Sequence, residues 1–228
     1  MKTKHLALVC ALLLASNYSF SQSMVGFWKV DRVMVGDRDV TPVAKWFRYH
    51  ADQSYQSGNG WSQNSMGTWT YDEQTAEFLP YNRQGEPDEY GAFVILFENG
   101  NMYWEREEEG MKVAVTLSPI TEMPMAPKDS ISGNWQLVSV LQDGQESTEG
   151  HDLPKELFVS WGGTYRATKA DGSQARGFWH MDPHAAEFHM VDWNREVDFM
   201  AFDVSFDNDL VKMVPWKDRS LTYTYQRK

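Results

Sequence analysis

Cysteine is nearly missing from this sequence: its 228 residues contain one, Cys10. Long apolar runs are missing as well, because no stretch after the N-terminus is apolar enough for a transmembrane helix. Basic residues are scarce beside acidic ones, 21 against 32, which gives a net charge of -11. Such a surface repels phosphate backbones and anionic lipid surfaces. We therefore expect no nucleic acid partner and no membrane insertion.

The N-terminus predicts export. Two lysines precede an apolar run at Leu6–Ala15, and Ser19–Ser21 then places small residues where a signal peptidase cleaves. We expect a signal peptide over 1–21. Cys10 lies inside it without the small preceding residue of a lipidation signal, so no lipid anchor is expected. The mature protein would then be periplasmic or secreted, without disulfides, and stabilised by packing alone.

Two halves of the chain repeat each other. Four segments recur in order at offsets of 107 to 110 residues: Gly26–Val30 as Gly133–Leu137, Gly67–Asp72 as Gly177–Asp182, Ala76–Phe78 as Ala186–Phe188, and Phe93–Phe97 as Phe202–Phe206. Four ordered matches exceed chance and indicate two copies of one domain. We expect the first domain at 22–120, a Pro-containing linker at 121–131, and the second domain at 132–228.

Each copy reads as a series of short strands. Alternating apolar residues are separated by turn signals such as Gly58–Gly60 and Asn99–Gly100, and one helical turn is conceivable at Leu153–Leu157. The strands expected in the first copy are 27–35, 44–50, 53–57, 65–72, 75–82, 91–98, 101–107 and 111–118. About eight antiparallel strands in under a hundred residues predict an all-β protein of two small up-and-down barrels.

A short motif opens each copy: Gly26-Phe27-Trp28 in the first and Gly133-Asn134-Trp135 in the second. A Gly-x-Trp at the first strand, followed by a meander of about eight strands, resembles the lipocalin-like (calycin) barrels. The tandem copies resemble the small bacterial members of that group. The resemblance implies that both tryptophans close the barrel base. It also implies that the protein holds a small apolar or amphipathic ligand.

Aromatic residues are abundant, with ten tryptophans. Four of them occupy equivalent strand positions in the two copies and are expected to be structural core residues: Trp28, Trp69, Trp135 and Trp179. Five are less regular and are candidates for a cavity mouth or an exposed platform, although packing accounts for them too: Trp61, Trp104, Trp161, Trp193 and Trp216.

One strand predicts a ligand site. Met102, Trp104 and Arg106 alternate onto one face, and an inward arginine can hold a carboxylate through paired hydrogen bonds. Fatty-acid-binding barrels, related to the lipocalin-like group, use inward arginines in this way. The alternative is an arginine that reaches solvent beside the neighbouring glutamates. The second copy has valine, within Leu210–Val214, where Arg106 falls.

Other chemistry finds little support. The second copy holds four histidines, His151, His180, His184 and His189, but Pro183 disfavours a helix that would bring the middle pair together. The sequence groups no nucleophile with a base and an acid, and has no phosphate-binding glycine loop. We expect no metal site, no cofactor and no enzymatic activity.

Two alternatives to a ligand-holding barrel stay open. One alternative is that filled barrels bind a protein or a glycan by their outer surface. In the first copy, one strand is apolar on its second face as well, at Ala92, Val94 and Leu96, and another surface usually covers such a face. The matching face of the second copy, at 201–205, is more polar. The other alternative is that the chain forms one outer-membrane barrel of about sixteen strands, which the linker and the restarted motif disfavour.

Overall fold

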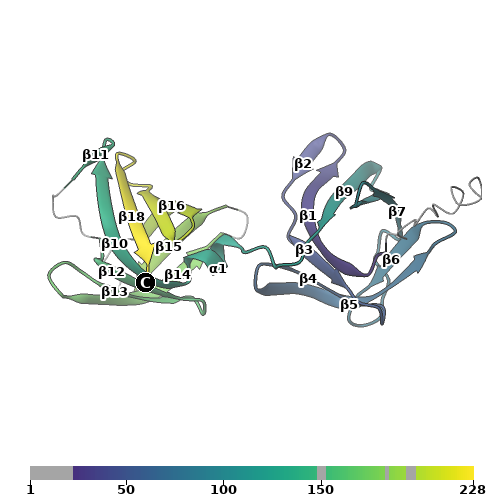
Figure 1. The fold of residues 1–228 in the computed structure, drawn as a ribbon, viewed down its shortest axis with the longest axis horizontal. Helices are drawn as coiled ribbons and strands as arrows, with labels where there is room; N and C mark the ends of the chain where they lie inside the picture. The colour runs from purple at the N-terminus through teal and green to yellow at the C-terminus, as the bar shows by residue number, and fades with distance from the viewer. Residues whose placement is uncertain (1–22, 148–152, 183–184, 194–198) are drawn as a thin grey trace, which may run out of the picture.

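The computed structural model describes residues 23–147, 153–182, 185–193 and 199–228. The expected signal peptide at 1–21 lies outside the described residues, as do His151 and His184. Within them the chain forms two β-barrels, joined by a linker that contains a short helix (Figure 1).

The first barrel is a meander of eight antiparallel strands closed by pairing of its first and last members. The strands are β1 (Gly26–Val35), β3 (Trp46–Tyr49), β4 (Ser54–Asn59), β5 (Ser62–Asp72), β6 (Glu77–Tyr81), β7 (Phe93–Glu98), β8 (Asn101–Glu108) and β9 (Met111–Pro119). A ninth, short strand, β2 (Arg38–Val40), pairs only with the far end of β1 among the described strands.

The second barrel repeats this plan. Its strands are β10 (Gly133–Gln142), β12 (Glu156–Ser160), β13 (Thr164–Thr168), β14 (Gln174–Met181), β15 (Glu187–Asp192), β16 (Met200–Asp207), β17 (Leu210–Pro215) and β18 (Leu221–Arg227), with β11 (Gln145–Glu146) as the extra strand. β10 closes the barrel against β18, as β1 does against β9.

The expectation of an all-β protein with two separately closed barrels is confirmed. All eight strands expected in the first copy are present, within a few residues of their expected ends, whereas β2 was missed. The alternative of one continuous barrel of about sixteen strands is wrong, since no described strand of one sheet pairs with the other. The helical turn at Leu153–Leu157 is also wrong, because β12 begins within it.

The two barrels share a detail that strand alternation alone does not predict. The β1–β9 pairing shifts register between Val30 and Arg32, and the β10–β18 pairing shifts between Leu137 and Ser139. An extra residue at such a bulge bends a strand and strengthens its twist. Each barrel is therefore curved at the same place, where the long first strand must bend to pair on both sides.

The barrel interiors differ in composition. In the first, the Trp104 ring lies 5.1 Å from Phe47, 5.3 Å from Phe78 and 5.4 Å from Phe93, measured between centroids. Equivalent registers place Leu157 of the second barrel where Phe47 lies, and Met213 where Trp104 lies. The first barrel thus carries rings on β3 and β8 where the second has Leu157 and Met213, whereas the second carries Tyr223 and Tyr225 on β18 where the first has Val115 and Leu117.

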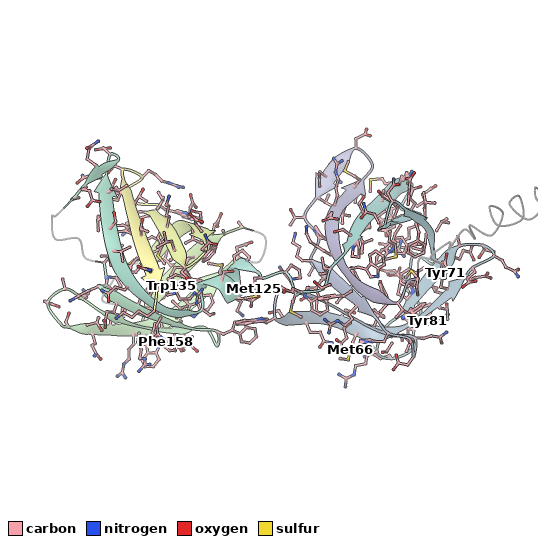
Figure 2. All side chains as sticks on the ribbon, in the orientation of Figure 1. Met66, Tyr71, Tyr81, Met125, Trp135 and Phe158 are labelled. Atoms are coloured by element: carbon pink, nitrogen blue, oxygen red, sulfur yellow. The ribbon has the colours of Figure 1, made fainter. Side chains whose placement is uncertain are left out.

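The motif tryptophans are buried, and Figure 2 shows Trp135 inside the second barrel. In both copies the indole Nε1 donates to the carbonyl oxygen four residues earlier, at 3.0 Å from Trp28 and 2.7 Å from Trp135. The second copy adds a cation: the Arg227 guanidinium lies 4.3 Å from the Trp135 ring and donates to the Ser132 carbonyl at 2.7 Å. In the first copy Pro119 takes the place of Arg227.

A buried carboxylate ties the barrels together. Asp129 lies on the short helix α1 (Pro127–Ile131), and its Oδ2 accepts the backbone N–H of Ala126 at 3.1 Å and of Trp61 at 3.0 Å. Its Oδ1 accepts the indole N–H of Trp161 at 2.8 Å. Trp61 belongs to the first barrel and Trp161 to the second, so one side chain joins both barrels to the linker. Gly60 permits this approach, since a Cβ there would collide with the Asp129 carboxylate.

Candidate functional site

The three residues expected to hold a ligand do share one wall of the first barrel. Met102 and Trp104 are buried, and the Arg106 side chain is 8% exposed. Their partners across the sheet, Leu117 and Val115 for the first two, are buried as well.

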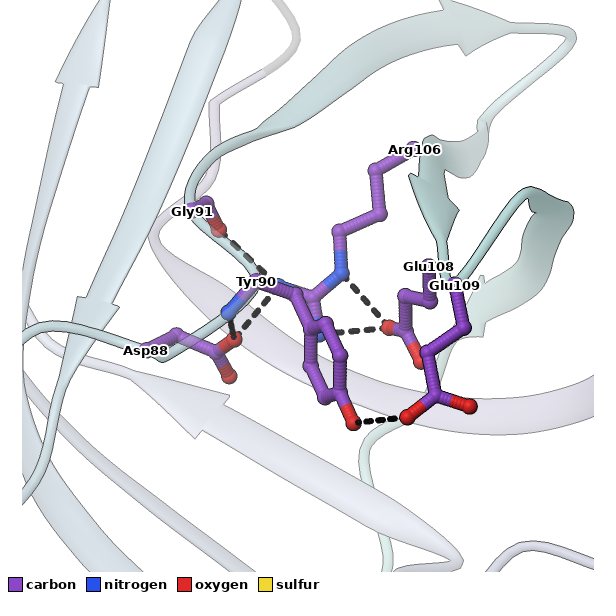
Figure 3. Close-up of polar contacts among 6 residues, drawn as sticks. All are labelled: Asp88, Tyr90, Gly91, Arg106, Glu108 and Glu109. Atoms are coloured by element: carbon purple, nitrogen blue, oxygen red, sulfur yellow. Dashed lines mark hydrogen bonds and ion pairs between the residues drawn. The ribbon is translucent and has the colours of Figure 1, made fainter.

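The Arg106 guanidinium already has protein partners (Figure 3). Nη1 donates to Asp88 Oδ1 at 2.7 Å and to the Gly91 carbonyl at 2.9 Å, while Nε donates to Glu108 Oε1 at 2.6 Å. Its Cζ lies 3.8 Å from the centroid of the Phe93 ring. Two carboxylates of the protein thus occupy the positions that a ligand acid would take, and the group fills this end of the barrel. A ligand role for Arg106 stays a prediction.

The second barrel is hollow at the corresponding end. A cavity of about 570 Å³ opens there, within the range of small-molecule sites. Apolar side chains form most of its wall: Leu153, Pro154, Ala167, Ala175, Met190, Met200, Ala201, Phe202 and Pro215. Polar side chains complete it: Tyr165, Lys169, Asp192, Lys217 and Tyr223.

Strand register explains why one barrel is filled and the other is open. Glu105 pairs with Val94 in the first barrel, and Val214 pairs with Asp203 in the second. The residue equivalent to Arg106 is therefore Pro215, and the expected valine is wrong by one position. Pro215 is a short side chain on the cavity wall. Where the first barrel inserts a long cation with its own carboxylates, the second leaves space.

The cavity wall carries few charged groups, and these are of both signs. Lys169 and Lys217 lie on the wall, and the carboxylate of the buried Asp192 lies near Tyr165. Burial, and then the Asp192 charge, raises the pKa of Tyr165 to about 12. Asp192 and Lys217 each also interact with another group of the protein. The lysines on the wall outnumber the carboxylate, which suits an apolar molecule that carries an acidic group.

No motif in the sequence singles out this cavity, because most of its wall consists of ordinary strand residues. Only comparison of the two copies position by position, with the correct register, shows the exchange of Arg106 for Pro215. Of the five irregular tryptophans, Trp104 is buried and the other four are exposed: Trp61, Trp161, Trp193 and Trp216.

The histidines do not assemble a metal centre in the described part of the chain. His180 and His189 pair across β14 and β15 with ring centroids 6.1 Å apart. No group of three His, Cys, Asp or Glu side chains that could hold a metal ion occurs among the described residues. The same residues include no helix long and apolar enough to cross a membrane.

The sequence matches no model of a known protein family, and a search of curated proteins gives no match. The two eight-stranded antiparallel barrels in tandem fit a lipocalin-like fold.

Proposed function

We propose that this chain is an exported, non-catalytic binding protein of the lipocalin-like group that holds a small amphipathic molecule in its second barrel. The observation that carries the proposal is the cavity of about 570 Å³, which combines an apolar wall with Lys169 and Lys217. The apolar body of the ligand lies against Met190, Met200 and Phe202, and its acidic group faces the lysines.

The first barrel serves as an internal comparison. It has the same strands and the same bulge, yet Arg106, Trp104 and Phe47 fill its interior. Stability alone thus favours a filled barrel in this fold, since close packing removes voids. Retention of a cavity in one copy is what a binding role requires.

A pair of probes tests the proposal: dodecanoic acid and dodecanol, added to the full mature chain and followed by calorimetry or by quenching of tryptophan fluorescence. We expect the acid to bind more tightly than the alcohol, and the variants Lys169→Met and Lys217→Met to weaken the acid selectively. A charge-assisted hydrogen bond contributes about 1.5–3 kcal/mol, or roughly tenfold to a hundredfold in affinity.

The matched control is Lys112→Met in the first barrel, where the lysine is exposed and paired with Glu105. This variant should bind both probes as the unmodified protein does. Failure of dodecanoic acid to bind, or equal weakening of acid and alcohol by the two cavity variants, would refute an acid-binding cavity in the second barrel.

A further inference from the structure

A second feature of the second barrel lies on its outside. Five large apolar side chains, each 38% to 58% exposed, form the surface that we call the aromatic face: Phe178, Val191, Trp193, Phe199 and Trp216. Phe178 lies 5.7 Å from Trp193 between ring centroids and pairs with Val191 across β14 and β15. The surface is therefore continuous rather than a scatter of single residues.

Polar groups are set among these rings. The His189 ring lies 5.1 Å from Phe199 and 5.3 Å from Trp216, and His180 lies beside it. The Arg176 guanidinium lies 5.0 Å from the Trp193 ring. Imidazole and guanidinium groups thus lie beside the rings, and the four aromatic side chains of the face are each 42% to 58% exposed.

Charges of both signs lie on and around the face. The Asp203 carboxylate accepts the Trp216 indole N–H at 2.8 Å and forms an ion pair with Arg219. Arg176 and Glu187, which also project outward here, contribute one charge of each sign, and the exposed Arg166, which pairs with Arg176, adds a positive charge. A face without a strong excess of either sign, on a chain of net charge -11, suits an uncharged ligand, because an anionic polymer would be repelled by the surrounding protein.

The first barrel shows that the fold does not need these rings. Thr68 pairs with Tyr81 as Phe178 pairs with Val191, so threonine takes the place of Phe178. By the same registers, Arg83 corresponds to Trp193 and Glu107 to Trp216. The exchange is confined to these positions, because the first barrel has Tyr81 where Val191 lies and the exposed Val94 where Asp203 lies. The sheet therefore closes without rings at the positions of Phe178, Trp193 and Trp216, and large exposed apolar patches mark binding surfaces.

We propose that the aromatic face binds a neutral glycan. The apolar C–H faces of sugar rings stack on Phe178, Trp193 and Trp216, and the hydroxyl groups exchange hydrogen bonds with the side chains beside the rings. A protein partner is less suited, because Val191 is the one aliphatic side chain among the five and imidazoles occupy the middle of the face. Self-association would bring together two acidic copies. The face lies on the outer surface, so this inference is independent of the cavity proposed above.

The test uses the full mature chain and a panel of neutral hexasaccharides: β-1,4-linked glucose, xylose, mannose and N-acetylglucosamine, and α-1,4-linked glucose. Binding is measured by calorimetry. We expect at least one member to bind, and the double variant Phe178→Thr with Trp193→Arg to weaken it at least tenfold. These replacements are the residues that the first barrel carries, so the thermal unfolding midpoint should change little.

The matched control is Val94→Asp with Leu96→Ser in the first barrel, which exchanges exposed apolar residues for those of the second copy and should leave glycan binding unchanged. The proposal is overturned if no member of the panel binds at millimolar concentration, or if the double variant binds as the unmodified protein does. A concentration-dependent dimer that the double variant abolishes would assign the face to self-association instead. Retained binding of dodecanoic acid by the double variant separates this site from the cavity.

Discussion

Asp129 offers the most direct test of how the two barrels are held. The variant Asp129→Ala removes acceptors from three donors: two backbone N–H groups, of Ala126 and Trp61, and the Trp161 indole. Asp129 itself is 2% exposed, so water cannot readily replace its oxygens.

The magnitude follows from the surroundings of each bond. In the bond to Ala126, the side chain of the third helical residue accepts the backbone N–H of the N-cap residue, as in a capping box, and this bond contributes about 1 kcal/mol. The bond to Trp61 is a charge-assisted one that crosses to the first barrel and contributes about 1.5–3 kcal/mol. Trp161 is 41% exposed, so water compensates most of its loss and leaves less than about 1 kcal/mol. We expect the variant to lower the free energy of unfolding by about 3–5 kcal/mol in total.

The assay combines urea unfolding with small-angle X-ray scattering. If Asp129 joins the barrels, the variant should unfold earlier and its scattering at neutral pH should show a wider range of distances between barrels. Trp161→Phe, which removes only the indole donor, is the matched control and should change stability by less than about 1 kcal/mol. A loss below about 1 kcal/mol for Asp129→Ala, with unchanged scattering, would refute the reasoning.

Three further outcomes are expected. Trp28→Ala and Trp135→Ala should each lower the free energy of urea unfolding by about 3–5 kcal/mol. Trp135→Ala should have the larger effect because Arg227 loses its ring partner, and equal losses would show that the contact between Arg227 and Trp135 does not stabilise the barrel. Arg106→Leu should lower the free energy of unfolding by about 2–4 kcal/mol, measured by thermal unfolding, because Asp88 and Glu108 lose their shared cation. The variant should bind dodecanoic acid as the unmodified protein does. A selective loss of acid binding would instead identify Arg106 as a ligand contact. Burial and the Asp192 charge raise the pKa of Tyr165 from 10.0 to about 12, so the stability that this residue adds is complete below pH 10 and is lost as the pH rises through about 12. Tyr165→Phe should therefore lessen the fall of the thermal unfolding midpoint between pH 10 and pH 12. A variant with the same alkaline profile as the unmodified protein would contradict this assignment.

The sequence was sufficient for the architecture because the repeat and the strand alternation are local signals. Gly67–Asp72 and Gly177–Asp182 occupy matching strands, and the turn at Asn99–Gly100 joins β7 to β8. The strand β2 was missed because its three residues carry no alternation that distinguishes them from a loop. The helix α1 was missed for a related reason: five residues with a leading proline read as linker, and their order comes from Asp129.

The sequence alone could not show which groups surround the predicted ligand site. Alternation correctly placed Met102, Trp104 and Arg106 on one inward face, but alternation says nothing of what lies opposite. Asp88 reaches Arg106 from a loop 18 positions earlier in the chain. Whether an inward cation awaits a ligand or is already neutralised is decided by such long-range contacts.

The two copies together give a physical criterion for function that neither gives alone. Both copies form the same barrel. Where their side chains differ in size or polarity at equivalent positions, closure of the barrel does not depend on which side chain is present. Inside, Arg106 gives way to Pro215, and a packed end becomes a cavity. Outside, Thr68 gives way to Phe178, and an exposed ring replaces a polar side chain at that position. Both changes act against the stability or solubility of the second barrel, since voids forfeit packing and exposed rings favour aggregation. The second barrel is therefore the part in which binding is to be sought.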